Sequence, residues 1–171
     1  SQAQLQLPGR KLYAVDNLIR FAADGLLLTI FFIAAIAGVY WLRHQTKKDI
    51  VRLAPIVIMA GMTSLLLGKL LSLVYQPDTA RPFVEKGLEA GAAYINNPGF
   101  PSDHALLAVV LVSALWFVAQ YKKLAVVLAV LVVVMCIARV LALVHTPLDV
   151  AGGIVLGLAG TVWYRARDAH A

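Results

Sequence analysis

The sequence predicts an all-α integral membrane protein: a polytopic helical bundle of about five transmembrane helices preceded by an interfacial helix. Of its 171 residues, 61% are hydrophobic and 14% are charged, and the mean hydropathy is +0.80. A soluble domain carries about 45–50% apolar and about 25% charged residues. The apolar residues also form long blocks, and about 20 of them in a row span a bilayer. We therefore expect residues 1–171 to form a single membrane-embedded domain and exclude a soluble enzyme or a disordered chain.

The apolar blocks locate the helices in order. Residues 11–20 place apolar side chains at helical spacing between polar ones, which indicates a short amphipathic helix lying at the interface. Spans are then expected over 22–42, 53–75, 102–119, 124–144 and 147–164. Pro55 is expected in the first turn of the second span, where a missing N–H costs little. Residues 1–10 are expected to be disordered or vector-derived.

The net charge of +6 comes from basic residues that flank the apolar blocks. This is the pattern of charges that set membrane topology, so we expect no nucleic-acid partner. Eight of the 15 basic residues fall in two loops and the C-terminal segment, which five spans place on one side: Arg43, Lys47, Lys48, Arg52, Lys122, Lys123, Arg165 and Arg167. The positive-inside rule makes that side cytoplasmic. The N-terminus is then outside and the C-terminus inside.

Ionisable residues gather at the opposite, extracytoplasmic ends of the spans. They are Lys69, Arg81, Asp103, His104, Arg139, His145 and Asp149, and Ser102 lies beside them. Such residues at membrane depth are functional candidates by default. Lys and Arg neutralise phosphoryl groups, and a helix N-terminus attracts anions. Two histidines can serve as nucleophile and as proton donor. This combination predicts a site for a phosphate ester.

The same residues form three motifs: Lys69 followed by Arg81-Pro82, the run Pro101-Ser102-Asp103-His104, and Arg139-x5-His145-x3-Asp149. Together they resemble the type 2 phosphatidic acid phosphatase superfamily of membrane lipid phosphatases, over about residues 60–160. The aspartate in the second motif and the Arg-Pro-Phe at 81–83 resemble its undecaprenyl-diphosphatase branch. One departure is the first motif, where eleven residues separate Lys69 from Arg81 and the family has six.

The resemblance implies a role for each residue. His145 would attack phosphorus and form a phosphohistidine, Asp149 would orient its ring, and His104 would protonate the leaving oxygen. Phosphate-binding residues would be Lys69, Arg81, Ser102, Asp103 and Arg139. The family uses no metal and no cofactor, and we expect none here. Structural roles are also open: Thr146 to Asp149 resembles a capping box, and Ser102 is expected as the N-cap of the third span.

The expected substrate is a membrane lipid phosphate. The resemblance favours undecaprenyl diphosphate, hydrolysed to the monophosphate on the outer face of a bacterial inner membrane. That reaction recycles the lipid carrier of peptidoglycan synthesis and is linked to bacitracin resistance. Two alternatives stay open: a broader phosphatidate or phosphatidylglycerophosphate phosphatase, and a small anion transporter or channel. No oligomer is predicted. Gly152, Gly153, Gly157 and Gly160 are expected to form a face for close helix packing.

Overall fold

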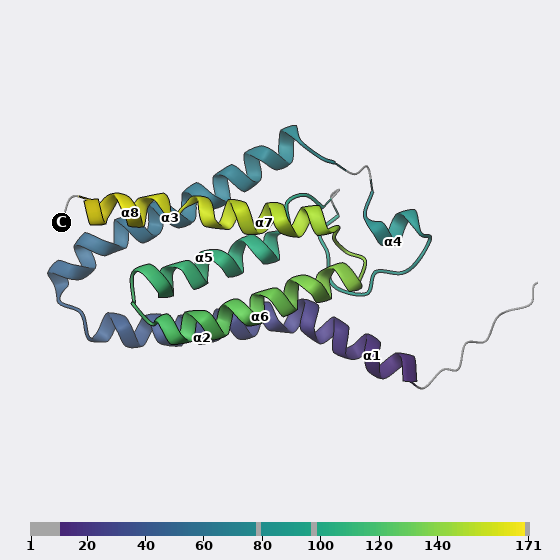
Figure 1. Ribbon diagram of the computed structural model, residues 1–171, viewed down its shortest axis with the longest axis horizontal. Helices are drawn as coiled ribbons and strands as arrows, with labels where there is room; N and C mark the ends of the chain where they lie inside the picture. Colours follow the sequence, from purple (N-terminus) through teal and green to yellow (C-terminus); the bar gives the residue numbers. More distant parts are fainter. Residues whose placement is uncertain (1–10, 78–79, 97–98, 170–171) are drawn as a thin grey trace, which may run out of the picture.

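A computed structural model describes residues 11–77, 80–96 and 99–169, and all the regular structure of these segments is helical (Figure 1). The elements are α1 (Lys11–Arg20), the π-helical turn η1 (Phe21–Gly25), α2 (Leu26–Arg43), α3 (Lys47–Val74), α4 (Pro82–Glu85), α5 (Asp103–Phe117), α6 (Lys122–Leu141), α7 (Pro147–Ala159) and α8 (Val162–Ala169). The predicted helical bundle is confirmed. The expectation for residues 1–10 lies outside the described residues.

Four of the described helical segments are long and apolar enough to cross a membrane: Asp16–Arg43, Lys47–Val74, Lys122–Leu141 and Pro147–Arg165. The fifth predicted span is the shorter α5, with 15 residues. At 1.5 Å per residue it covers about 22 Å, less than the hydrocarbon core of about 30 Å. α5 packs against α2, α3, α6 and α7. A helix surrounded by others in this way need not match the thickness of the lipid.

Two expected helix boundaries differ from the structure. The predicted interfacial helix forms as α1, but it runs without interruption through η1 into α2. The second span starts six residues earlier than expected, because Thr46 caps it by accepting the backbone N–H of Asp49. Pro55 therefore lies in the interior of α3, and the expectation that it occupies the first turn is wrong.

Small residues bring α7 close to α5 and α3, as the glycine spacing predicts. A Cβ added at Gly153 would lie 2.5 Å from the carbonyl oxygen of Ser102, and one at Gly160 would lie 2.0 Å from that of Ala60. The buried hydroxyl of Ser64 donates to the carbonyl of Gly157 and accepts the N–H of Gly160. The predicted close packing is confirmed, and it fixes α7 against the centre of the bundle.

The two ends of the bundle differ in content. The α2–α3 and α5–α6 connections lie at one end with the end of α8 (Figure 1). The long connection that contains α4, the α6–α7 turn and the start of α5 lie at the other end, towards α1 (Figure 1). This is the grouping of loops that the five predicted spans require. The side of the membrane that each end faces stays a prediction.

Candidate active site

Backbone hydrogen bonds assemble the site from segments that are distant in sequence. The N–H of Ser102, just before α5, donates to the carbonyl of Asp149 in the first turn of α7 at 2.9 Å. The loop after α4 is fixed to the end of α6, because Gly91 donates to the carbonyl of Ala142 at 3.1 Å. Phe83 donates to Leu143 at 3.0 Å in the same way. Three helix ends and one loop are thus held together.

A cavity of about 160 Å³ lies where these segments meet. It is lined by Arg81, Ala93, Tyr94, Ile95, Gly99, Pro101, Asp103, His104, Arg139 and His145. Both predicted histidines and both predicted arginines therefore face one small space, together with Asp103. The sequence motifs are distant along the chain, and the fold brings them to one place.

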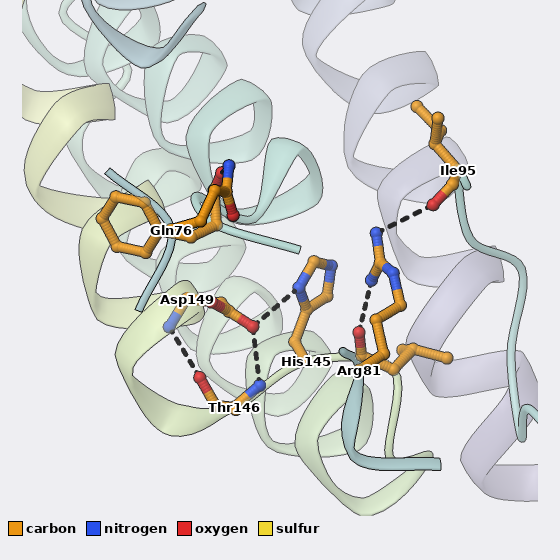
Figure 2. A network of polar contacts seen from close by, with 8 residues as sticks. Gln76, Arg81, Ile95, His145, Thr146 and Asp149 are labelled. Atoms are coloured by element: carbon orange, nitrogen blue, oxygen red, sulfur yellow. Dashed lines mark hydrogen bonds and ion pairs between the residues drawn. The ribbon is translucent and has the colours of Figure 1, made fainter. Parts of the chain in front are cut away.

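His145 is backed by Asp149, as Figure 2 shows. Its Nδ1 lies 3.4 Å from Oδ2 of Asp149, and both side chains are buried. This distance is longer than an ordinary hydrogen bond. The second ring nitrogen, Nε2, lies on the side of the ring away from the carboxylate (Figure 2). Burial lowers the pKa of His145, and the neighbouring Asp149 carboxylate partly opposes this effect.

Asp149 also has the structural role that the sequence suggests. Its Oδ2 accepts the N–H of Thr146 at 2.8 Å, and its own N–H donates to the Thr146 hydroxyl at 3.2 Å. This reciprocal pair is a capping box at the start of α7. The cap fixes the carboxylate, so the same interaction that begins the helix orients the acid beside His145.

Arg81 is buried and holds the loop around the cavity. Its guanidinium donates to the carbonyls of Val144 and Ile95, the latter at 3.1 Å (Figure 2). Its Cζ lies 5.5 Å from the centre of the Tyr94 ring. Burial lowers the pKa of Arg81. The negative charge of Asp149 raises this pKa and is the largest effect in that direction. Gly99, at φ +122°, passes so close that a Cβ there would lie 3.2 Å from Oδ2 of Asp149.

Arg139 is buried between two side chains. Its Nη1 donates to Oδ1 of Asp24 at 2.8 Å and lies 3.5 Å from Nε2 of His104. Asp24 is the residue that our sequence analysis missed. An acidic residue inside the first apolar block was the available signal, because a carboxylate at membrane depth is costly without a function or a partner.

Lys69 and Ser102 are not brought to the cavity that the histidines share. Lys69 is exposed and lines a second cavity of about 170 Å³, which has only Pro101 and Asp103 in common with the first. The hydroxyl of Ser102 is buried and has no hydrogen-bond partner within the described residues. Ser102 does occupy the N-cap position, but its side chain makes no capping hydrogen bond. The prediction that Ser102 is the N-cap residue of this helix is therefore confirmed.

Within residues 11–77, 80–96 and 99–169, no group of three or more His, Cys, Asp or Glu side chains is arranged to hold a metal ion. Independence from metal stays a prediction, and the chemistry must be tested directly.

These features define a membrane-embedded helical protein with a site at which two histidines and two arginines line one cavity. The chain belongs to the PAP2 superfamily, whose sequence model matches residues 49–169. It is 29% identical over 158 residues to the bacitracin transport permease protein BcrC of Bacillus licheniformis. The aligned region covers 91% of this chain and 72% of that protein. It is also similar to the solved structure of a transmembrane PAP2-type phosphatidylglycerolphosphate phosphatase from Bacillus subtilis. The TM-score is 0.55 at 25% identity, over 97% of this chain and 80% of that one.

The match confirms the resemblance that the three motifs predict. A phosphatase family accounts for a cavity lined by two arginines and two histidines, because a phosphoryl group carries the negative charge that such a cavity attracts. The chain is therefore a membrane lipid phosphatase of the PAP2 superfamily.

Proposed function

We propose that this protein removes the terminal phosphate of a lipid diphosphate, with undecaprenyl diphosphate as the preferred substrate, through a phosphohistidine intermediate. One observation carries the proposal: His104, His145, Arg81 and Arg139 line a single cavity, and Asp149 lies behind His145. In this arrangement a phosphoryl group would meet a nucleophile, a proton donor and two cations.

In the first proposed step, Nε2 of His145 attacks the terminal phosphorus atom. The bond from phosphorus to the bridging oxygen breaks, and the departing lipid monophosphate takes a proton from His104. Asp149 holds the imidazole of His145 in the required tautomer and stabilises the positive charge that develops, as the acid does in a catalytic triad. Arg81 and Arg139 stabilise the charge on the transferring oxygens.

In the second proposed step, a water molecule attacks the phosphohistidine. His104, now neutral, accepts a proton from this water, and the bond between phosphorus and Nε2 of His145 breaks. Inorganic phosphate leaves, and both histidines return to their starting states. The proton that His104 gives in the first step is thereby recovered in the second, and the cycle balances without a metal or a cofactor.

The choice of substrate rests on similarity. Asp103 within Pro-Ser-Asp-His and the Arg-Pro-Phe at 81–83 support the undecaprenyl-diphosphatase branch. Similarity to a protein named as a bacitracin transport permease supports a link to bacitracin resistance, and it also keeps transport as a competing function. Similarity to a phosphatidylglycerolphosphate phosphatase keeps that lipid as the competing substrate. We place the site on the extracytoplasmic side.

The test uses the purified chain in lipid nanodiscs with EDTA present. Phosphate release is measured for undecaprenyl diphosphate, phosphatidylglycerophosphate and phosphatidate, alone and in competition. We expect the diphosphate to be hydrolysed most efficiently and labelled phosphohistidine to be trapped on acid-free quenching. His145→Ala should abolish both, with the exposed His44→Ala as control. Full turnover by His145→Ala would overturn the mechanism, and preference for another lipid would overturn the substrate assignment.

A further inference from the structure

Asp24 is a single carboxylate that makes two separate contacts at the edge of the cavity. Oδ1 accepts from Nη1 of Arg139 at 2.8 Å, and Oδ2 accepts the backbone N–H of Ala93 at 3.0 Å. Arg139 and Ala93 both line the cavity. Asp24 itself does not line it and lies 115 positions before Arg139 in the chain. It can therefore act on the reaction through the groups that it holds and through its charge, without touching the substrate.

The local structure explains how Asp24 reaches them. Asp24 lies in η1, a π-helical turn, and such turns are frequent at functional sites. Gly25 makes room for the wide turn, because a Cβ there would lie 2.8 Å from the ring of Phe21. The turn packs against α6, and both surfaces are built of alanine: Ala23 on η1 and Ala138 and Ala142 on and just after α6. This close contact between η1 and α6 brings the Asp24 carboxylate within hydrogen-bonding distance of the Arg139 guanidinium.

Arg139 lines the cavity while only part of its guanidinium is engaged by other side chains. Nη1 is held by Asp24 and lies beside His104, whereas Nε is buried and without a hydrogen-bond partner within the described residues. A guanidinium has five N–H donors in a rigid plane, so fixing one nitrogen fixes the direction of the others. An arginine on a flexible side chain would otherwise lose rotamer freedom at every binding event.

We propose, on the basis of the function proposed above, that Asp24 is a positioning residue for phosphoryl transfer. It holds Arg139 in the orientation that meets the transferring phosphoryl group, and it fixes the loop segment at Ala93 that forms one wall of the cavity. Asp24 is separate from the three motifs and lies on the first long apolar helix, which thereby becomes part of the active site.

The proposal has a signature that a purely structural role lacks. Asp24 is negative and close to an anion site, so it weakens the attraction for phosphate while it improves orientation. Asp24→Asn removes the charge and replaces one of the two accepting oxygens by an NH2 donor, which would face the donor of either Arg139 or Ala93. We expect kcat to fall by about 10- to 100-fold. At the same time inorganic phosphate should inhibit at a severalfold lower concentration.

The experiment measures kcat and the inhibition constant for inorganic phosphate in nanodiscs, with rates referred to the number of sites that form labelled phosphohistidine. Partial unfolding then changes neither quantity. The exposed Asp16→Asn, earlier on the same continuous helix, is the matched control and should match the wild type. Asp24→Glu keeps the charge on a longer side chain. Its kcat should lie between those of Asp24→Asn and the wild type, with an unchanged inhibition constant for phosphate.

The outcomes separate this inference from the proposed function. If His145→Ala is inactive but Asp24→Asn keeps the wild-type kcat and inhibition constant, the role of Asp24 is wrong and the phosphatase mechanism stands. If His145→Ala stays active, the mechanism itself fails. Should Asp24→Asn not be recovered in folded form, Asp24→Glu decides: a reduced kcat supports the proposal, and a wild-type kcat overturns it.

Discussion

The backbone N–H of Ser102 donates a hydrogen bond of 2.9 Å to the carbonyl oxygen of Asp149. This bond joins the residue before α5 to the first turn of α7. His104 and His145 lie close to the two bonded residues in sequence, and both line the same cavity. Gly153 makes the approach possible, since a side chain there would meet the Ser102 carbonyl. The relative position of the two histidines is thus set by rigid helix packing.

The first prediction tests this packing with Gly153→Ala. The new Cβ would lie 2.5 Å from a backbone oxygen, which cannot rotate away, so α7 must shift relative to α5. We expect a loss of about 1–3 kcal/mol in stability, as for other over-packed cores, together with a clear loss of phosphatase activity. Thermal unfolding in detergent and phosphate release measure the two effects.

Gly38→Ala on α2 is the matched control for this substitution. No atom lies within 4 Å of a Cβ at that position, so stability and activity should be unchanged or slightly improved. If Gly153→Ala behaved like Gly38→Ala, the α5–α7 contact would be looser than the structure indicates.

The second prediction concerns the pH profile and Asp149→Asn. Attack by His145 requires its neutral form, and burial lowers its pKa, so the acid limb of kcat/KM should lie below the ordinary histidine value of about 6.5. Activity is lost as the pH falls through this lowered pKa. Because Asp149 raises the pKa, Asp149→Asn should move the acid limb to still lower pH. It should also reduce the maximal rate by about 100-fold or more.

Asp49→Asn provides the control for the loss of a carboxylate in the first turn of a helix. Asp49 follows the N-cap Thr46 in the same Thr-x-x-Asp sequence and accepts from the Thr46 hydroxyl at 2.6 Å, but it lies at the opposite end of the bundle. Its substitution should leave the pH profile in place. An acid limb that stays fixed in Asp149→Asn would show that His145 is not the group that titrates.

The third prediction compares Lys69 with Arg139. Lys69 is exposed and lines the neighbouring cavity, whereas Arg139 is buried and lines the cavity of the histidines. We expect Lys69→Ala to lower kcat/KM by less than about threefold. Arg139→Ala should lower it by about 100- to 1,000-fold, the usual cost of removing a donor to a developing oxyanion. Steady-state kinetics in nanodiscs measure both.

Lys47→Ala at the start of α3, an exposed lysine at the other end of the helix, is the control for loss of charge. Equal losses for Lys69→Ala and Arg139→Ala would mean that the Lys69 side chain reaches the phosphoryl group during turnover.

Features that depend on neighbouring residues could be predicted from the sequence. Long apolar blocks locate the helices, because a segment in lipid must form all its backbone hydrogen bonds within itself. The Thr146–Asp149 cap is readable because its partners are three residues apart. Glycine spacing likewise predicted the packed face of α7. The family motifs could be recognised as sequences, although their meeting at one cavity depends on packing between helices that no local pattern encodes.

The errors arise where tertiary contacts decide. Asp24 looks like one acid at the start of a hydrophobic block, and its partner Arg139 is 115 residues away. Ser102 is the N-cap of α5, as predicted, but no local pattern shows that its hydroxyl is buried and makes no capping hydrogen bond. The position of Lys69 relative to Arg81 depends on where α3 ends and on the path of the loop that follows. The sequence does not predict that path for the eleven residues between them.

The fourth prediction tests which end of the bundle faces outward. The buried Cys136 is the only cysteine, so it is first replaced by serine. Single cysteines are then introduced at the exposed positions Glu89, at the active-site end, and Lys123, at the other end.

The positive-inside rule places the end with eight of the 15 basic residues in the cytoplasm. A membrane-impermeant maleimide should therefore label Glu89→Cys in intact cells and Lys123→Cys only after permeabilisation. The reverse pattern would put the active site on the cytoplasmic side, and labelling of both from outside would contradict the separation of the two ends in the fold.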